Sequence, residues 1–103
     1  MATKGTIQSV QINASLAEAN TIVAAVAGRR IVVIAYVISS SVSNVIRWED
    51  GAGGPILGRL NLGATRPFFV LSPVGLFVTS LGNLLNMNVN AGNVLGHLLF
   101  LER

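Results

Sequence analysis

Residues 31–38 form an unbroken run of eight apolar residues, IVVIAYVI, and this run constrains the fold more than any other stretch. Its β-branched and aromatic side chains are typical of a β-strand. Successive side chains of a strand point to opposite faces. A regular strand would place Ile31, Val33, Ala35 and Val37 on one face and Val32, Ile34, Tyr36 and Ile38 on the other. Both faces are apolar, and a chain of 103 residues can cover one of them with a second sheet of its own. We therefore expect a partner to cover the other face.

Gly and Asn residues recur at short intervals, and the segments between them are rich in β-branched and aromatic residues. This pattern is typical of an all-β sandwich or barrel. We expect eight main strands, at residues 7–13, 21–27, 29–40, 45–50, 56–62, 66–72, 84–90 and 94–101. The stretch at 73–82 is predicted to be mostly loop, with room for a short strand at 76–79.

The distribution of apolar faces predicts how these strands are arranged. The third, sixth and eighth strands are apolar on both faces, whereas the fourth, fifth and seventh are apolar on one face. In an eight-stranded jelly roll, strands 1, 8, 3 and 6 form one sheet and strands 2, 7, 4 and 5 form the other. The two-faced strands then share a sheet, and the second strand is the exception because it too is apolar on both faces. We therefore predict an eight-stranded antiparallel jelly-roll sandwich as a single domain at residues 7–103, preceded by a flexible arm at residues 1–6.

Two strands with clear alternation indicate which side chains face inward. In the fourth strand, Ile46 and Trp48 share a face, and we expect both in the core. In the seventh strand, Asn86, Asn88 and Asn90 alternate with apolar residues, so we expect them on a polar solvent face. The asparagine row and Trp48 also leave open an alternative function, a carbohydrate- or small-ligand-binding β-sandwich module.

Charged residues are scarce, at 11% of the chain, against about 25% in a typical domain. A surface so poor in charge favours association with other proteins. The seven Lys and Arg residues are scattered apart from Arg29 and Arg30, so we expect no nucleic-acid partner. The apolar run at 31–38 is far shorter than the ~20 residues that span a bilayer, and we expect no membrane partner.

No set of residues indicates catalysis, and we expect neither an enzyme nor a bound metal or cofactor. The chain has no cysteine, and its one histidine, His97, has no other metal-ligating residue near it in sequence. Glu49 and Asp50 are adjacent, so a strand would point them to opposite faces. The glycine-rich segment at 51–54 lacks the lysine of a phosphate-binding loop.

Five segments resemble those of a known family: residues 21–31 (TIVAAVAGRRI), the strand around Tyr36, and residues 71–77 (LSPVGLF), 84–88 (LLNMN) and 96–98 (GHL). Together they resemble small structural proteins of tailed bacteriophages, namely head decoration or head-fibre proteins with a trimeric jelly-roll fold. The resemblance covers roughly residues 20–101. Members of this family often have a Trp-Phe pair and an acidic residue after the Pro-x-Gly turn, where this chain has Leu76, Phe77 and Val78.

The resemblance implies a homotrimeric virion protein that is assembled in the host cytoplasm, binds the major capsid protein on the surface of a phage head and uses no cofactor. We predict that the trimer contact uses outward side chains of the two-faced sheet, with Tyr36 and Phe68 as aromatic anchors. The sequence leaves open which side chains of this sheet point outward. The predicted interface residues are Tyr36, Ile34, Ile38, Phe68, Val70 and Leu99. The predicted capsid contact lies in the arm, at Thr3, Lys4 and Gly5, because a flexible segment can become ordered on a lattice.

Overall fold

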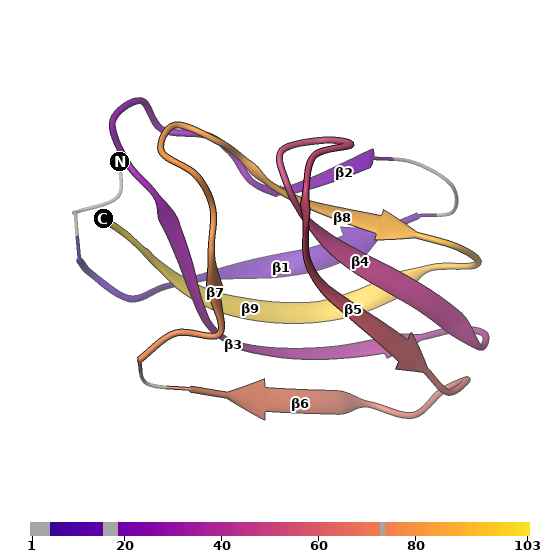
Figure 1. The fold of residues 1–103 in the computed structure, drawn as a ribbon. Coiled ribbons are helices and arrows are strands. Elements are labelled where there is room, and N and C mark those ends of the chain that lie inside the picture. Colours follow the sequence, from indigo (N-terminus) through magenta and orange to yellow (C-terminus); the bar gives the residue numbers. More distant parts are fainter. Residues whose placement is uncertain (1–4, 16–18, 73) are drawn as a thin grey trace.

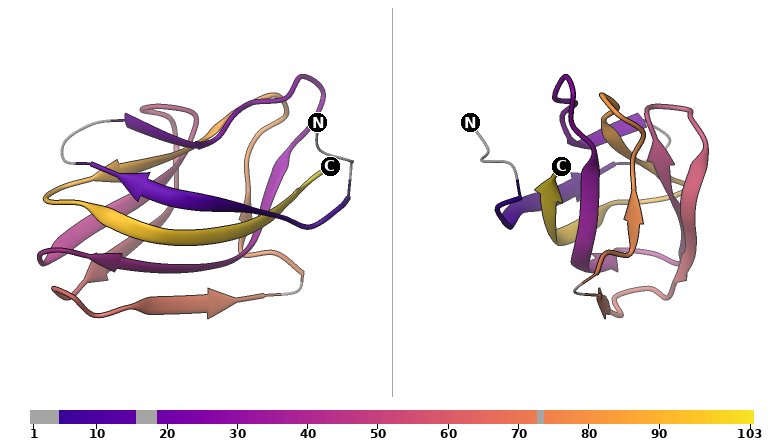
Figure 2. Two further views of the ribbon diagram at one scale, coloured as in Figure 1. Left: turned by 180° about the vertical axis from the view of Figure 1, so that it is seen from behind. Right: turned by 60° about the vertical axis from the view of Figure 1, so that its left-hand side comes forward.

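The computed structural model describes residues 5–15, 19–72 and 74–103. All regular elements in these residues are β-strands, and they form two sheets that pack face to face as a sandwich (Figure 1, Figure 2). The strands are β1 (Gln8–Ala14), β2 (Ala19–Val23), β3 (Ile31–Ser40), β4 (Asn44–Asp50), β5 (Ile56–Leu62), β6 (Phe68–Leu71), β7 (Phe77–Val78), β8 (Leu85–Val89) and β9 (Val94–Glu102). The predicted all-β sandwich is confirmed.

The strand order is that of the predicted jelly roll. One sheet has the order β1-β9-β3-β6, the other has the order β2-β8-β4-β5, and the pairs of named strands are antiparallel. When the short β7 is set aside, these are the predicted orders 1-8-3-6 and 2-7-4-5. The ninth strand is β7, which lies within the stretch at 76–79 predicted to have room for a short strand. It pairs with β3 at Val32 and Val33, beyond the part of β3 that pairs with β6. This makes the first sheet five-stranded.

A β-bulge at Ile34 interrupts the alternation of β3, the central strand of the five-stranded sheet. The register with β9 shifts between Val33 and Ala35, so Ile34 is an extra residue without a partner on β9. An extra residue moves the side chains that follow it to the opposite face. Val33 therefore faces the core before the bulge, and Tyr36 faces it afterwards. The expectation of one regular alternation along residues 31–38 is wrong for this reason.

The bulge lies where the strand that pairs with β3 changes from β6 to β7. The backbone N–H of Ser72, just after β6, donates to the carbonyl oxygen of Ile34 at 2.8 Å. Gly75 follows with a φ of 105°, and a Cβ at this position would lie 2.9 Å from Cγ1 of Val32. Only glycine allows both this backbone conformation and this close approach. The connection between β6 and β7 thereby covers the side chain of Val32, which is buried.

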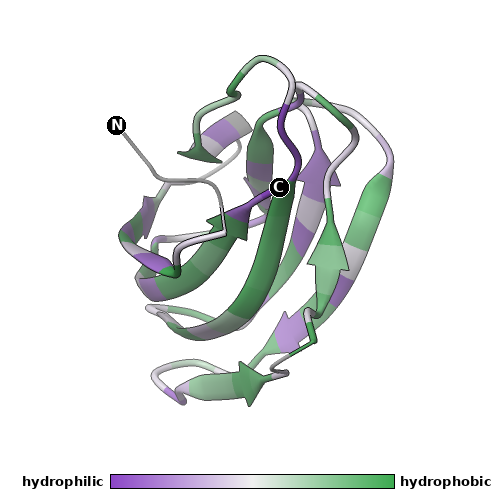
Figure 3. Ribbon diagram, turned by 90° about the vertical axis from the view of Figure 1, so that its left-hand side faces the viewer, coloured by the Kyte–Doolittle hydropathy of each residue, from purple (hydrophilic) through white to green (hydrophobic). Residues whose placement is uncertain are grey.

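Among the described residues, Trp48 is the largest of the fully buried side chains in the core between the two sheets. The rings of Tyr36 and Phe77 lie against it, with centroid distances of 5.1 and 5.8 Å. The prediction that Ile46 and Trp48 face inward is confirmed, since they are 0% and 1% exposed. Hydrophobic residues predominate along the ribbon (Figure 3). Full burial of a large apolar side chain contributes about 1.5–3 kcal/mol, and this burial holds the two sheets together.

Candidate interaction surface

The outer face of the five-stranded sheet exposes large apolar side chains on three neighbouring strands. Phe69 and Leu71 of β6 are 60% and 57% exposed, and side chains of β3 and β9 beside them are also exposed. We use the name "apolar face" for the surface formed by Ala35, Val37, Phe69, Leu71, Leu95 and Leu99.

The strand register makes the apolar face continuous. Val37 is opposite Phe69 on one side and His97 on the other. Residues that are opposite each other in antiparallel strands share a face, with Cβ atoms about 4.5–5.5 Å apart. The next row along the sheet consists of Leu99, Ala35 and Leu71. A shallow hollow of about 340 Å³ lies over these two rows.

The apolar face ends at β1, whose outward side chains are polar. Gln11 is opposite His97, and Ser9 and Asn13 flank Gln11 on the same face. All three β1 side chains are exposed. The outer surface of the sheet therefore changes from apolar on β9, β3 and β6 to polar on β1.

The apolar face carries no full charge, and the acidic residues that the structure describes lie elsewhere. Glu49 and Asp50 belong to β4 in the other sheet, and Glu102 is buried. His97 is exposed and is the titratable side chain that borders the face. Covering a charged group is costly. Because the apolar face presents none, a partner can cover it without neutralising a charge.

The structure places the residues predicted for the trimer interface on both sides of the sheet. Leu99 belongs to the apolar face, as expected. Tyr36 and Ile38 point into the core instead and are 9% and 1% exposed. Ile34 is buried at the bulge. The prediction that Tyr36, Ile38 and Ile34 are outward side chains is therefore wrong. The bulge at Ile34 reverses the face of Tyr36 and Ile38, which follow it.

The two predicted residues of β6 are also on the inner side. Phe68 and Val70 are half-buried and pack against the core. The ring centroid of Phe68 lies 6.0 Å from that of Tyr36. Phe69, between them in the strand, points outward. The aromatic side chain that could anchor a contact on this face is therefore Phe69 rather than Phe68 or Tyr36.

Sequence reasoning missed five residues of the apolar face: Ala35, Val37, Phe69, Leu71 and Leu95. A usable signal was His97, because burying a polar side chain without a hydrogen-bond partner is costly. Side chains two residues apart in a strand share a face, so Leu95 and Leu99 are assigned to the outer face together with His97. Extending that assignment to β3 and β6 requires the register, which the sequence does not provide.

The predicted capsid contact lies largely outside the described residues. Thr3 and Lys4 are not among them, whereas Gly5 is described. Gly5 has a φ of 81°, and its backbone N–H donates to the carbonyl oxygen of Glu102 at 2.7 Å. The flexible arm predicted at residues 1–6 therefore includes a residue that is bonded to the end of β9.

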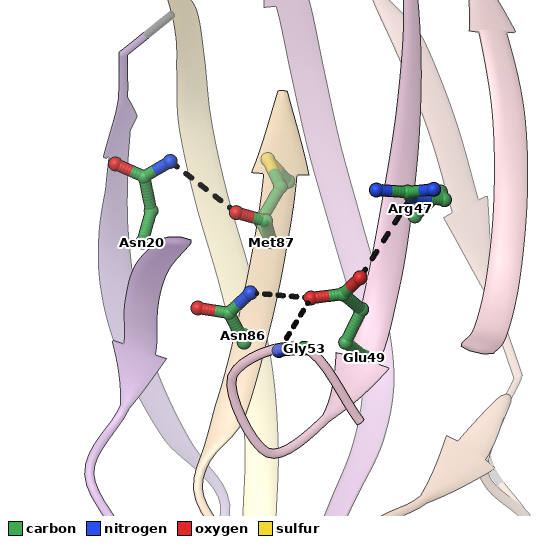
Figure 4. Close-up of polar contacts among 6 residues, drawn as sticks. All are labelled: Asn20, Arg47, Glu49, Gly53, Asn86 and Met87. Atoms are coloured by element: carbon green, nitrogen blue, oxygen red, sulfur yellow. Dashed lines mark hydrogen bonds and ion pairs between the residues drawn. The ribbon is translucent and has the colours of Figure 1, made fainter. Parts of the chain in front are cut away.

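A buried polar cluster surrounds Glu49 on the four-stranded sheet (Figure 4). Its Oε1 accepts hydrogen bonds from Nδ2 of Asn86 at 2.8 Å and from the backbone N–H of Gly53 at 3.2 Å. Its Oε2 lies 3.7 Å from Nε of Arg47. This carboxylate thus connects β4, β8 and the turn that follows β4.

The asparagine row of β8 differs from the expectation of a solvent face. Asn86 is fully buried, Asn88 is half-buried and Asn90 is exposed. The row is covered at Asn86 because the turn at residues 51–54 bonds to Glu49 beside it. Since Trp48 is buried as well, two residues that suggested carbohydrate binding are not available at the surface.

Asp50 connects β4 to the turn at residues 80–83. Its Oδ1 accepts hydrogen bonds from the backbone N–H of Ser80 at 2.9 Å and from Nδ2 of Asn83 at 3.0 Å, and Oδ2 accepts from the Ser80 hydroxyl. Burial raises the pKa of the Asp50 carboxyl, but these hydrogen bonds and the positive charge of Arg30 outweigh burial and hold the pKa below its ordinary value. Glu49 and Asp50 therefore both serve as hydrogen-bond acceptors that fasten turns, which is a structural use of a carboxylate.

Within residues 5–15, 19–72 and 74–103, no group of three or more His, Cys, Asp or Glu side chains could hold a metal ion. The same residues contain no helix long and apolar enough to cross a membrane. Comparison of the sequence with known protein families and with characterised proteins found no match.

Proposed function

We propose that this protein has a structural rather than a catalytic role, and that it forms a homotrimer through its apolar face and decorates the capsid of a tailed bacteriophage. The observation that carries the proposal is the exposure of the apolar face on three neighbouring strands of a closely packed sandwich. A large contiguous apolar patch on a protein surface usually marks an interaction site. An exposed aromatic side chain, here Phe69 of β6, is typical of interface cores.

A second copy of the same chain suits this face. The face presents no charge for a partner to neutralise, and the polar side chains of β1 border it. An apolar centre with a polar rim is the usual organisation of a protein interface. A standard interface buries about 800 Å² on each partner. At about 25 cal/mol per Å² of apolar area, a contact on this scale can offset the entropic cost of association.

The number of copies and the capsid as partner are proposed from the sequence resemblance over residues 20–101. A trimer repeats each capsid contact three times, and repetition strengthens weak contacts through avidity. The scarcity of charged residues agrees with a protein that uses much of its surface for contacts with other subunits.

Light scattering coupled to size-exclusion chromatography tests the assembly. We expect the natural sequence to have the mass of three chains at micromolar concentration and Phe69→Asp to have the mass of one. Asn61→Asp is the matched control, because it adds the same charge at an exposed position of β5 in the other sheet. A monomeric natural protein, or a Phe69→Asp variant that keeps the full mass, would contradict the proposal.

Co-sedimentation with undecorated capsids of the phage that encodes the protein tests the second part. We expect saturable binding in multiples of three copies and weaker binding of monomeric Phe69→Asp, because avidity is lost. A trimer that binds no capsid would refute decoration and leave assembly intact.

A further inference from the structure

The outer face of the four-stranded sheet carries two arginines directly beside each other. Arg47 of β4 is opposite Arg59 of β5, and on its other side it is opposite Asn88 of β8. Opposite residues of antiparallel strands share a face, with Cβ atoms about 4.5–5.5 Å apart. The three side chains therefore form one row across three strands, on the sheet that does not contain the apolar face.

Two like charges opposite each other destabilise a sheet unless a counter-charge lies near. Arg47 has such a partner, since its Nε lies 3.7 Å from Oε2 of Glu49. Glu49 is itself buried and bonded to Asn86 and the backbone of Gly53, so its position is fixed. Arg47 is thereby held from one side, while its side chain remains 38% exposed.

Arg59 lacks a comparable partner among the described residues. Asp50 accepts hydrogen bonds from Ser80 and Asn83, and Glu102 lies near Arg29 on the other sheet. No ion pair joins Arg59 to an acidic residue in the part of the chain that the structure describes. Arg59 is an exposed residue, and a guanidinium group has N–H donors for a ligand.

A shallow hollow of about 170 Å³ lies over this row. It is lined by Val45, Arg47, Arg59, Asn88 and Asn90. The two guanidinium groups offer donors in a planar fork, and the two amide groups can each add an N–H donor. A planar fork of donors matches the oxygens of a carboxylate or phosphate better than it matches any neutral group.

We propose that this arginine row is a binding site for a small oxyanion, a carboxylate or a phosphate group. Arg59 provides the main contact because no carboxylate in the described part of the chain is paired with it. Arg47, held by Glu49, provides the second charge, and Asn88 and Asn90 donate from the β8 side of the hollow. The site goes beyond the proposed assembly function and does not depend on it, because it lies on the other sheet.

A titration followed by NMR of the ¹⁵N-labelled full chain tests the site with three probes: glucuronate, inorganic phosphate and neutral glucose. Ionic strength is kept constant. We expect saturable shifts at Arg47, Arg59 and Asn88 with at least one anion, and weaker binding at higher salt. Shifts with both anions would define a general oxyanion site, and shifts with glucuronate alone would define a site for carboxylated sugars. Equal binding of glucose, or no saturable shift in the row, would overturn the proposal.

Variants assign the contact to the arginine. Arg59→Gln is expected to weaken binding about tenfold, the effect of losing roughly 1.4 kcal/mol, and Arg59→Lys by less, since it keeps the charge but loses the fork. Arg66→Gln is the matched control, because it removes the same charge at an exposed position outside the hollow. Unchanged spectra elsewhere in the sheet show that each variant is folded. Equal weakening in Arg59→Gln and Arg66→Gln would mean that only net charge matters, which refutes a defined site.

Discussion

Nδ2 of Asn86 donates a hydrogen bond of 2.8 Å to Oε1 of Glu49 across the antiparallel pair of β8 and β4, and both residues are buried. Without this donor, the buried carboxylate of Glu49 would lose one of its hydrogen bonds. We therefore expect Asn86→Ala to lower the free energy of unfolding by about 1–3 kcal/mol, as measured by urea denaturation. Asn88→Ala, at the half-buried next position of the row, should change it by less than ~0.5 kcal/mol. Similar losses in both variants would contradict the assigned role of Asn86.

The size and burial of Trp48 predict a large loss of stability on truncation. Trp48→Ala should lower the free energy of unfolding by about 3–5 kcal/mol, because the large side chain leaves a cavity between Tyr36 and Phe77. Val45→Ala provides a control on the same strand, since Val45 points outward and is exposed. Its effect should stay within about 0.5 kcal/mol. Denaturation curves that shift equally for the two variants would show that the inner and outer faces of β4 are assigned incorrectly.

Neighbouring residues of β3 should respond differently to the same substitution. Val37→Asp places a charge on the apolar face, and we expect a folded monomer. Tyr36→Asp places a charge in the core, and we expect loss of the fold itself, because an unpaired buried charge costs several kcal/mol. Circular dichroism reports folding and light scattering reports mass. A folded, fully assembled Val37→Asp protein would exclude this face as the contact.

Asp50 makes stability depend on pH. Burial raises the pKa of its carboxyl, but hydrogen bonds from Ser80 and Asn83 and the charge of Arg30 outweigh burial, so the folded-state pKa lies below the ordinary value of 3.8. The contribution of Asp50 is then fully present above pH 3.8 and is lost as the pH falls through the lower folded-state pKa. Asp50→Asn does not titrate, so its free energy of unfolding should fall less than that of the natural protein between about pH 5 and about pH 2. Parallel pH curves would show that Asp50 does not contribute in this way.

The N-terminal residues provide a test of capsid binding that spares the sandwich. Deletion of residues 1–4 leaves Gly5 and its hydrogen bond to Glu102 in place. We expect an intact trimer with weaker co-sedimentation with capsids and a shallower dependence on salt, because the charge of Lys4 is removed. Binding that is unchanged at every salt concentration would exclude the arm and direct attention to the turn at residues 51–55.

The strand order could be predicted because it depends on a property of whole segments, namely whether one face or both faces of a strand are apolar. The identity of the outward residues could not, because it depends on single positions. One extra residue at Ile34 moves Tyr36 from the predicted outer face to the core. No local composition marks this bulge, since Ile34 lies within a uniform apolar run. The features that accompany it are distant in sequence: β3 changes partner there, and the backbone N–H of Ser72 donates to the Ile34 carbonyl oxygen.

The polar sites show a second limit of the same kind. Alternation in β8 correctly separates Asn86 from the core residues beside it, but it does not tell whether a turn covers the outer face. The turn at residues 51–54 does so at Asn86 and not at Asn90. Likewise, the pairing of Arg47 with Arg59 depends on the register between β4 and β5, which neither strand specifies alone.

The bulge sets which face of the sheet each later side chain of β3 occupies. A substitution at Ile34 alters one side chain, whereas removal of this residue would exchange inside and outside for those that follow it in the strand. Tyr36 would then lie at the surface and Val37 in the interior, although every other residue of the sequence is unchanged. Two relatives that differ here by a single inserted residue could therefore share a fold and nearly all of their sequence while presenting unrelated surfaces to their partners.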